Sequence, residues 1–208
     1  MPGDLRKGSF MASEFFVYLR LGFEHISDIK GYDHILFIAA LCAVYQLKEW
    51  RHLLWLVTAF TVGHSITLAL ATLRLITIND NLVEFLIPLT IFATSIINIV
   101  EPQNERRERA ERFKYVLALG FGLIHGMGFS NFLRAVLGGE ESIVVPLFSF
   151  NVGLEFGQIT ILLAILSVST IMVQRVRMPA RDWSLVLSGA TAGIAVTMMI
   201  ERMLPLLG

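Results

Sequence analysis

Residues 53–73, LLWLVTAFTVGHSITLALATL, decide the fold class of this chain. The stretch contains no Lys, Arg, Asp or Glu, and it is as long as the roughly 20 apolar residues that cross a bilayer as a helix. It also contains His64, a side chain that is costly to place in lipid unless it has a partner. The stretch therefore predicts a transmembrane helix with a polar site in its interior.

The composition of the whole chain agrees with a membrane protein. Of its 208 residues, 55% are hydrophobic and 16% are charged, whereas soluble domains have about a quarter charged residues. The apolar stretches predict six membrane spans, at residues 32–47, 52–75, 82–101, 114–137, 143–173 and 183–206. The predicted fold class is all-α, a polytopic membrane helical bundle of about six transmembrane helices.

Residues 12–28 precede these spans and predict an amphipathic helix at the membrane interface. Its apolar side chains recur at helical spacing: Phe15, Phe16, Leu19 and Phe23. Residues 1–11 are expected to be a disordered leader or an artificial extension, and residues 12–208 a single transmembrane helical domain. No apolar core of a cleavable signal peptide is visible near the N-terminus.

The basic residues indicate the orientation in the membrane. Connections 102–114 and 174–182 are rich in Arg, whereas 76–80 and 137–142 contain no Lys or Arg. Because basic loops stay inside, both termini are expected on the outer side, periplasmic in a bacterial inner membrane. The formal net charge is zero and so indicates neither an acidic nor a basic partner, and no nucleic-acid partner is expected. The expected partners are the lipid bilayer and a metal ion, with a homo-oligomer left open.

Small residues recur at every fourth position in two spans, as Gly122, Gly126 and Ser130 and as Gly189, Gly193 and Thr197. Such spacing lets helices approach closely in lipid, so both spans are expected to pack tightly against a neighbour. The single cysteine, Cys42, excludes an intrachain disulfide and is interpreted as a small packing residue.

Polar side chains within the spans indicate a buried site. At 1.5 Å per residue, His64 lies about 18 Å and His125 about 17 Å from the inner ends of their spans. Glu155 lies about 18 Å from the outer end of its span. In a hydrocarbon core of about 30 Å these three side chains are near the middle. His34 and Asn151 are expected nearer the outer face.

These residue types favour a divalent metal, because neutral imidazole is its common protein ligand and a carboxylate balances its charge. The predicted metal ligands are His25, Asp33, His34, His64, His125 and Glu155. Hydrogen bonds that orient these ligands are expected from Ser65, Asn151 and Gln158. The alternative for each lone histidine is an interhelical hydrogen bond. Helix packing is the interpretation of Thr90, Thr94 and Asn98.

Four strings in this order resemble the HupE/UreJ membrane proteins, most closely the second HupE/UreJ group: EHISDIKGYDHILF, FTVGHSITLAL, FGLIHGMGF and FNVGLEFGQ. The resemblance runs from about residue 22 to about residue 165. It implies a hydrogenase or urease accessory protein with nickel permease activity. The matching positions are His25, Asp33, His34, His64, His125 and Glu155. The first string is also similar to the His-x4-Asp-His signature of nickel/cobalt permeases, but seven residues separate His25 from Asp33.

Different classes of function remain open at this point. The resemblance favours a nickel/cobalt-type permease or accessory protein, in which residues 25–34 collect the ion and a midplane site passes it on. An intramembrane zinc-dependent hydrolase would use three histidines as ligands and Glu155 or Asp33 as general base. A b-type haem protein would use His64 and His125 as axial ligands. The expected cofactor or cargo is therefore Ni, Co or Zn, and an enzyme is the less favoured class.

Overall fold

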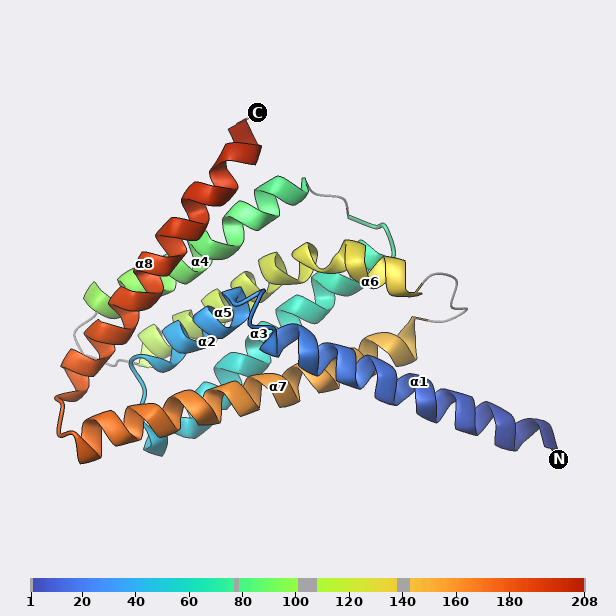
Figure 1. Cartoon of the computed structure of the whole chain (residues 1–208), viewed down its shortest axis with the longest axis horizontal. Helices are drawn as coiled ribbons and strands as arrows, with labels where there is room; N and C mark the ends of the chain where they lie inside the picture. Colours follow the sequence, from blue (N-terminus) through green and yellow to red (C-terminus); the bar gives the residue numbers. More distant parts are fainter. Residues whose placement is uncertain (1, 77–78, 101–107, 138–142, 208) are drawn as a thin grey trace.

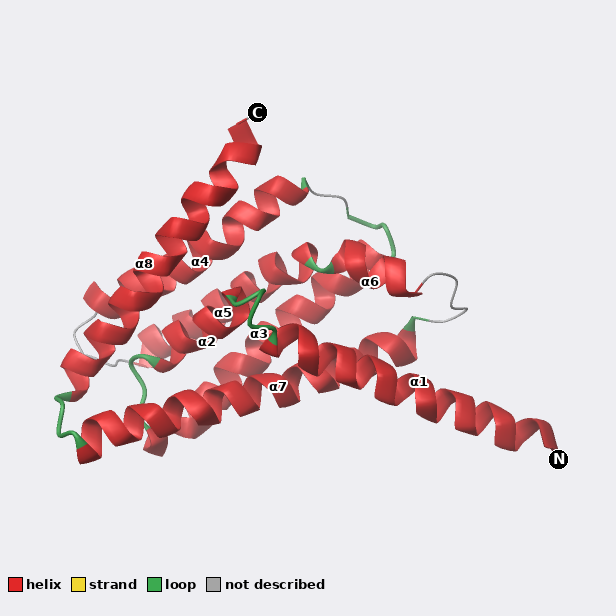
Figure 2. Ribbon diagram, viewed as in Figure 1, coloured by secondary structure: helices red, strands yellow, loops and turns green. Residues whose placement is uncertain are grey.

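The computed structural model describes residues 2–76, 79–100, 108–137 and 143–207, which form helices joined by short connections (Figures 1 and 2). The long helices are α1 (Pro2–Ser27), α3 (Trp50–Thr72), α4 (Asp80–Val100), α5 (Glu108–Gly128), α7 (Val144–Thr170) and α8 (Ala180–Leu207). The short elements are α2 (Asp33–Cys42), α6 (Ser130–Leu137), the 3₁₀ turn η1 (Leu47–Glu49) and the π-helical turn η2 (Ile171–Arg175). These described ranges contain no strand, and the predicted all-α class is confirmed.

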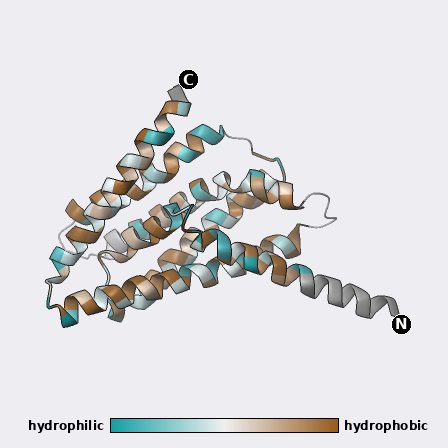
Figure 3. Cartoon of the chain, viewed as in Figure 1, coloured by the Kyte–Doolittle hydropathy of each residue, from teal (hydrophilic) through white to brown (hydrophobic). Residues whose placement is uncertain are grey.

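Four helical segments of the described chain are long and apolar enough to cross a membrane: Leu47–Thr72, Asp80–Val100, Val144–Arg175 and Ala180–Pro205. The other two predicted spans correspond to shorter apolar helices, Asp33–Cys42 and Phe113–Gly128. Hydrophobic residues are numerous along the helices (Figure 3). On α7 alone, the exposed side chains include Phe148, Phe156, Leu163 and Val168. Apolar surface of this extent suits lipid rather than water.

The helices pack as three pairs around a central short helix. The pairs are α3 with α5, α1 with α7, and α4 with α8 (Figure 1). Helix α2 contacts α4, α7 and α8, and residues 37–45 are all buried. The buried residues of α2 include Cys42, the single thiol of the chain, whose side chain is inaccessible. The N-terminal end of α2 therefore lies in the interior of the bundle.

Helix α1 runs in the same direction as α7 and crosses it in close contact (Figure 1), whereas the sequence predicted an interfacial helix. A Cβ on Gly22 would collide with the carbonyl oxygen of Phe150, and one on Gly153 would collide with that of Leu19. The two backbones can touch only because both residues lack a side chain. Helix α1 also begins at Pro2 and so includes most of the predicted leader. The division of the chain into a leader and one domain stays a prediction.

The predicted span 32–47 is α-helical only over the ten residues of α2. At 1.5 Å per residue, α2 is about 15 Å long, which is about half of a hydrocarbon core. Residues 28–32 separate α1 from α2. In this turn the backbone N–H of Lys30 donates to Asp28 at 2.9 Å, and that of His34 donates to Asp33 at 2.9 Å. The chain therefore carries an interrupted helix, α1 followed by α2.

The predicted span 114–137 is interrupted as well, because α5 ends at Gly128 and α6 begins at Ser130. Gly126 and Gly128 both have a low helix propensity. The Ser130 hydroxyl donates to the Met127 carbonyl at 3.0 Å and so satisfies one of the carbonyl groups left free at the end of α5. Phe129 is the one residue between the two helices.

The close approach predicted for Gly122 and Gly126 is confirmed, since a Cβ on either would collide with a carbonyl oxygen of α3. The corresponding prediction for Gly189 and Gly193 is wrong. A Cβ on either of these would meet no described atom within 4 Å, and both residues are exposed. Helix α8 instead buries its other face, which contains Ser188, Thr191 and Ala195. A ladder of small residues therefore did not identify the contact face of α8.

This difference predicts opposite effects of the same substitution. Gly122→Ala should lower the free energy of unfolding by about 1–3 kcal/mol, because the added methyl group is forced against the backbone of α3. Gly189→Ala should leave stability unchanged or raise it by up to about 1 kcal/mol, through the higher helix propensity of Ala. Thermal unfolding of both variants in the same detergent measures this, and equal midpoints would contradict the described packing.

Candidate metal centre

Four of the five histidines of the chain gather at the junction of α1 and α2. They come from four helices: His25 from α1, His34 from α2, His64 from α3 and His125 from α5. Ring nitrogens of His25, His34 and His64 all lie within 4.8 Å of one another. The centroid of the His125 ring lies 5.1 Å from that of His34. We refer to these four residues as the histidine cluster.

Most ring nitrogens of the histidine cluster are buried and have no hydrogen-bond partner within the described residues. These are Nε2 of His25, Nε2 of His34, Nδ1 of His125 and both ring nitrogens of His64. A buried polar atom left unpaired costs about 1–3 kcal/mol. Native proteins rarely leave several such atoms together, so these ring nitrogens are available to bind a ligand.

Asp33 sets the orientation of His34. Its Oδ1 lies 3.1 Å from Nδ1 of His34, and the Asp33 side chain is only 13% exposed. A carboxylate accepts hydrogen bonds, so Nδ1 carries the proton and Nε2 keeps its lone pair. A carboxylate hydrogen-bonded to the second nitrogen of a histidine is the usual support of a metal ligand.

Thr90 has the same effect on His125. The Thr90 hydroxyl donates its proton to the Ile87 carbonyl at 2.7 Å, and its oxygen lies 3.2 Å from Nε2 of His125. Because the hydroxyl has one proton, Nε2–H of His125 is the donor in the second bond, and Nδ1 keeps the lone pair. The sequence assigned Thr90 to helix packing, and the contact with His125 was missed.

Aromatic rings enclose the histidine cluster. The Phe129 ring centroid lies 3.7 Å from that of His25, and Phe129 stacks on Phe150 at 5.2 Å. Phe60 covers His125 from another side, with centroids 5.1 Å apart. These rings keep water away from the imidazoles, which strengthens any electrostatic interaction made there.

Two cavities reach the cluster near the junction of α1 and α2. One, of about 260 Å³, is lined by three of the histidines and by carboxyl-bearing residues, namely Asp28, Asp33 and Glu84. The other, of about 730 Å³, shares His25, Asp28 and Phe129 with the first. A cleft lined by carboxylates raises the local concentration of cations. We refer to the first as the acidic cavity.

Arg202, in the last turns of α8, also lines the acidic cavity. Its Nη2 lies 3.5 Å from Oδ2 of Asp33, and its Nη1 donates to the backbone carbonyl of Glu84 at 3.0 Å. It therefore joins α8 to α2 and α4 beside the histidine cluster. Arg202 is not among the predicted site residues, because none of the four motif strings lies in the final span. The available signal was a charged residue within an apolar helix.

Glu155 belongs to a different contact, between α7 and α3. Its Oε1 accepts a hydrogen bond from Thr58 at 2.7 Å, and Oε1 of Gln158 accepts one from Thr61 at 2.7 Å. The group of three neighbouring histidines found among the described residues does not include Glu155. Its assignment as a metal ligand stays a prediction.

The other two residues expected to orient ligands bond within their own helices. Ser65 donates to the Thr61 carbonyl at 2.7 Å, and Asn151 Nδ2 donates to the Leu147 carbonyl at 2.8 Å. The buried Oδ1 of Asn151 has no partner in the described part of the chain. The orienting role of both residues, and that of Gln158, also stays a prediction.

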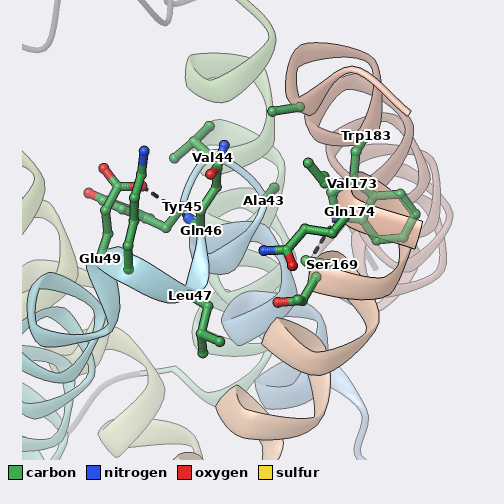
Figure 4. Close-up of a pocket in the computed structure, with 13 residues that line it drawn as sticks. Ala43, Val44, Tyr45, Gln46, Leu47, Glu49, Ser169, Val173, Gln174 and Trp183 are labelled. Carbon is green, nitrogen blue, oxygen red and sulfur yellow. Dashed lines mark hydrogen bonds between the residues drawn. The ribbon is translucent and has the colours of Figure 1, made fainter. Parts of the chain in front are cut away.

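A separate pocket of about 260 Å³ lies where α2 ends and α7 meets α8, away from the histidines (Figure 4). Polar side chains such as Gln46 and Gln174 line it, and Trp183 closes one side by donating to Ser169 at 2.9 Å. None of the predicted metal ligands lines this pocket. This pocket is therefore separate from the histidine cluster and from the acidic cavity.

Comparison with known proteins identifies the family. The chain matches the family described as "HupE / UreJ protein" over residues 4–202, nearly its whole length. No curated protein and no solved structure matches it. The match and the four apolar helices together indicate an integral membrane protein from a family with a nickel/cobalt permease or accessory role. This chain belongs to the HupE/UreJ family.

Proposed function

We propose that this chain is a permease for a divalent transition-metal ion of the nickel or cobalt type, with the histidine cluster as its intramembrane binding site. The observation that carries the proposal is the set of buried, unpaired ring nitrogens on His25, His34, His64 and His125. Imidazole is a favourable ligand for nickel, cobalt and zinc, whereas magnesium and calcium prefer oxygen ligands. The family membership supports metal handling.

The interrupted helix supports transport. Transporters commonly bind their cargo near the membrane midplane, where a helix is broken. Here the break between α1 and α2 brings His25 and His34 together, with ring centroids 4.8 Å apart. From His125, a buried face of α4 continues through Thr90, Thr94 and Asn98 toward the other end of the bundle. This polar face would supply oxygen atoms along the inward route.

Six membrane crossings follow if α1 with α2, and α5 with α6, each form one interrupted crossing. Basic side chains gather at the end opposite the acidic cavity. There Arg181 donates to the Asn98 carbonyl at 3.0 Å, and Lys114 lies 5.7 Å from the Tyr45 ring centroid. By the positive-inside rule, that end faces the cytoplasm. The acidic cavity and both termini then face the periplasm of a bacterial inner membrane, from which the ion would enter.

One observation favours a second candidate, an intramembrane zinc-dependent hydrolase. Ring nitrogens of three histidines lie within 4.8 Å of one another, and Asp33 supports one of these histidines, His34. A catalytic zinc site uses the same set of ligands. A metal held there would supply an activated water molecule. Asp28 and Glu84 line the acidic cavity and would be the nearest candidates for a general base.

The cluster predicts that metal binding depends on four histidines and not on the fifth. The Ala variants of His25, His34, His64 and His125 should each lower bound nickel or cobalt at least about tenfold, because each removes a ligand. His52→Ala is the matched control, since His52 is exposed and its Nδ1 lies 3.3 Å from the Tyr115 hydroxyl. Elemental analysis of metal-loaded protein after gel filtration measures the ratio. A metal-free wild type would refute the site.

Asp33→Asn should weaken metal binding by about 10–100-fold without unfolding the protein, because the amide supports His34 less well than a carboxylate does. Equilibrium titration with nickel in detergent measures this. An affinity equal to that of the wild type would show that Asp33 does not support a ligand.

Transport and hydrolysis give different results in reconstituted vesicles. A permease should move external nickel or cobalt to a dye trapped inside proteoliposomes, and His64→Ala should abolish this flux while His52→Ala retains it. A hydrolase should keep zinc through washing with a chelator and show no flux of any divalent ion. Retained zinc without ion flux would refute the permease proposal and support the hydrolase.

A further inference from the structure

Arg202 presents a fixed positive charge to the same cavity that the proposed function assigns to a cation. Its guanidinium contacts Asp33 at 3.5 Å, and the two side chains are only 27% and 13% exposed. Arginine stays charged at every physiological pH. Because water reaches this pair only partly, the charge of Arg202 is less screened there than on an open surface.

Asp33 is shared between two donors, the imidazole of His34 and the guanidinium of Arg202. Its Oδ1 faces Nδ1 of His34 at 3.1 Å, and its Oδ2 faces Nη2 of Arg202 at 3.5 Å. Interaction with a guanidinium reduces the negative charge that Asp33 offers to His34, and so makes His34 a weaker ligand. The guanidinium also repels a divalent ion directly. Both effects have the same sign and weaken binding of the ion.

We propose that Arg202 is a tethered counter-cation of the ion site, which draws the charge of Asp33 away from His34, repels the transported ion and keeps binding weak enough for release. This inference rests on the proposed binding of a divalent cation by the histidine cluster. Arg202 thereby becomes a residue that sets affinity and turnover without being a metal ligand itself. Its bond to the Glu84 carbonyl holds the guanidinium in position.

The test replaces the charge and keeps the side chain. Arg202→Gln retains amide donors, and Arg202→Met retains the apolar stem. Nickel titration of each purified full-length variant should give a dissociation constant about tenfold lower than that of the wild type. In proteoliposomes, both variants should show a lower half-saturating nickel concentration and a lower maximal rate. Tighter binding is a result that a purely structural role of Arg202 would not produce.

Two control variants are needed. One keeps a positive charge at position 202, and the other removes a positive charge at the opposite end of the bundle. Arg202→Lys should bind nickel within about twofold of the wild type, because the positive charge remains. Arg181→Gln removes an arginine at the opposite end, where it donates to the Asn98 and Ile99 carbonyls, and should leave the dissociation constant unchanged. Thermal unfolding of every variant reports stability separately.

The outcomes separate this inference from the proposed function. If the wild type binds and transports nickel but the Gln and Met variants bind it equally or more weakly, the counter-cation role is overturned and the permease stands. If neither neutral variant folds, Arg202 is a structural clamp and the inference is overturned as well. If the wild type itself binds no nickel or cobalt, the proposed function fails and the inference fails with it.

Discussion

Direct contact between helix backbones determines where the histidines lie. Gly22 lets α1 touch α7, and Gly63, Gly122 and Gly126 let α3 touch α5. Two of these glycines are neighbours of clustered histidines, since Gly63 precedes His64 and Gly126 follows His125. Adjacent residues on a helix point in different directions, so a glycine at the contact leaves the neighbouring imidazole free to face the interior. Any larger residue at these contacts would move the helices apart and separate the ligands.

A break in a helix is tolerated within a bilayer only where protein or a polar cavity covers it. The junction of α1 and α2 meets this condition, because α7 packs beside it and the acidic cavity opens onto it. The same condition makes the junction a suitable place for polar chemistry. Asp33 accepts a hydrogen bond from a backbone N–H at the start of α2, and the same carboxylate supports the imidazole of His34.

Hydropathy predicted the all-helical membrane class and the long apolar helices, because length and polarity alone determine these. It could not predict the short α2, since apolar residues continue past Cys42 to Tyr45 and conceal the end of the helix. Depth counting placed His64, His125 and Glu155 at one level, and the structure brings the two histidines near His34. In the structure Glu155 accepts a hydrogen bond from Thr58 instead. The depth of a residue does not determine the direction in which its side chain points around the helix. Arg202 and Thr90 were missed because the function of each depends on a partner distant in the sequence.

The buried position of Cys42 has a practical consequence for spectroscopy. The 208-residue chain contains this one thiol, and it lies in the centre of the bundle, where water-soluble reagents do not reach. A cysteine introduced on an exposed helix would therefore be the only one to react with a maleimide or a methanethiosulfonate. Pairs of spin labels at exposed positions of α7 and α8 can report distances in the native background, without first removing the endogenous residue.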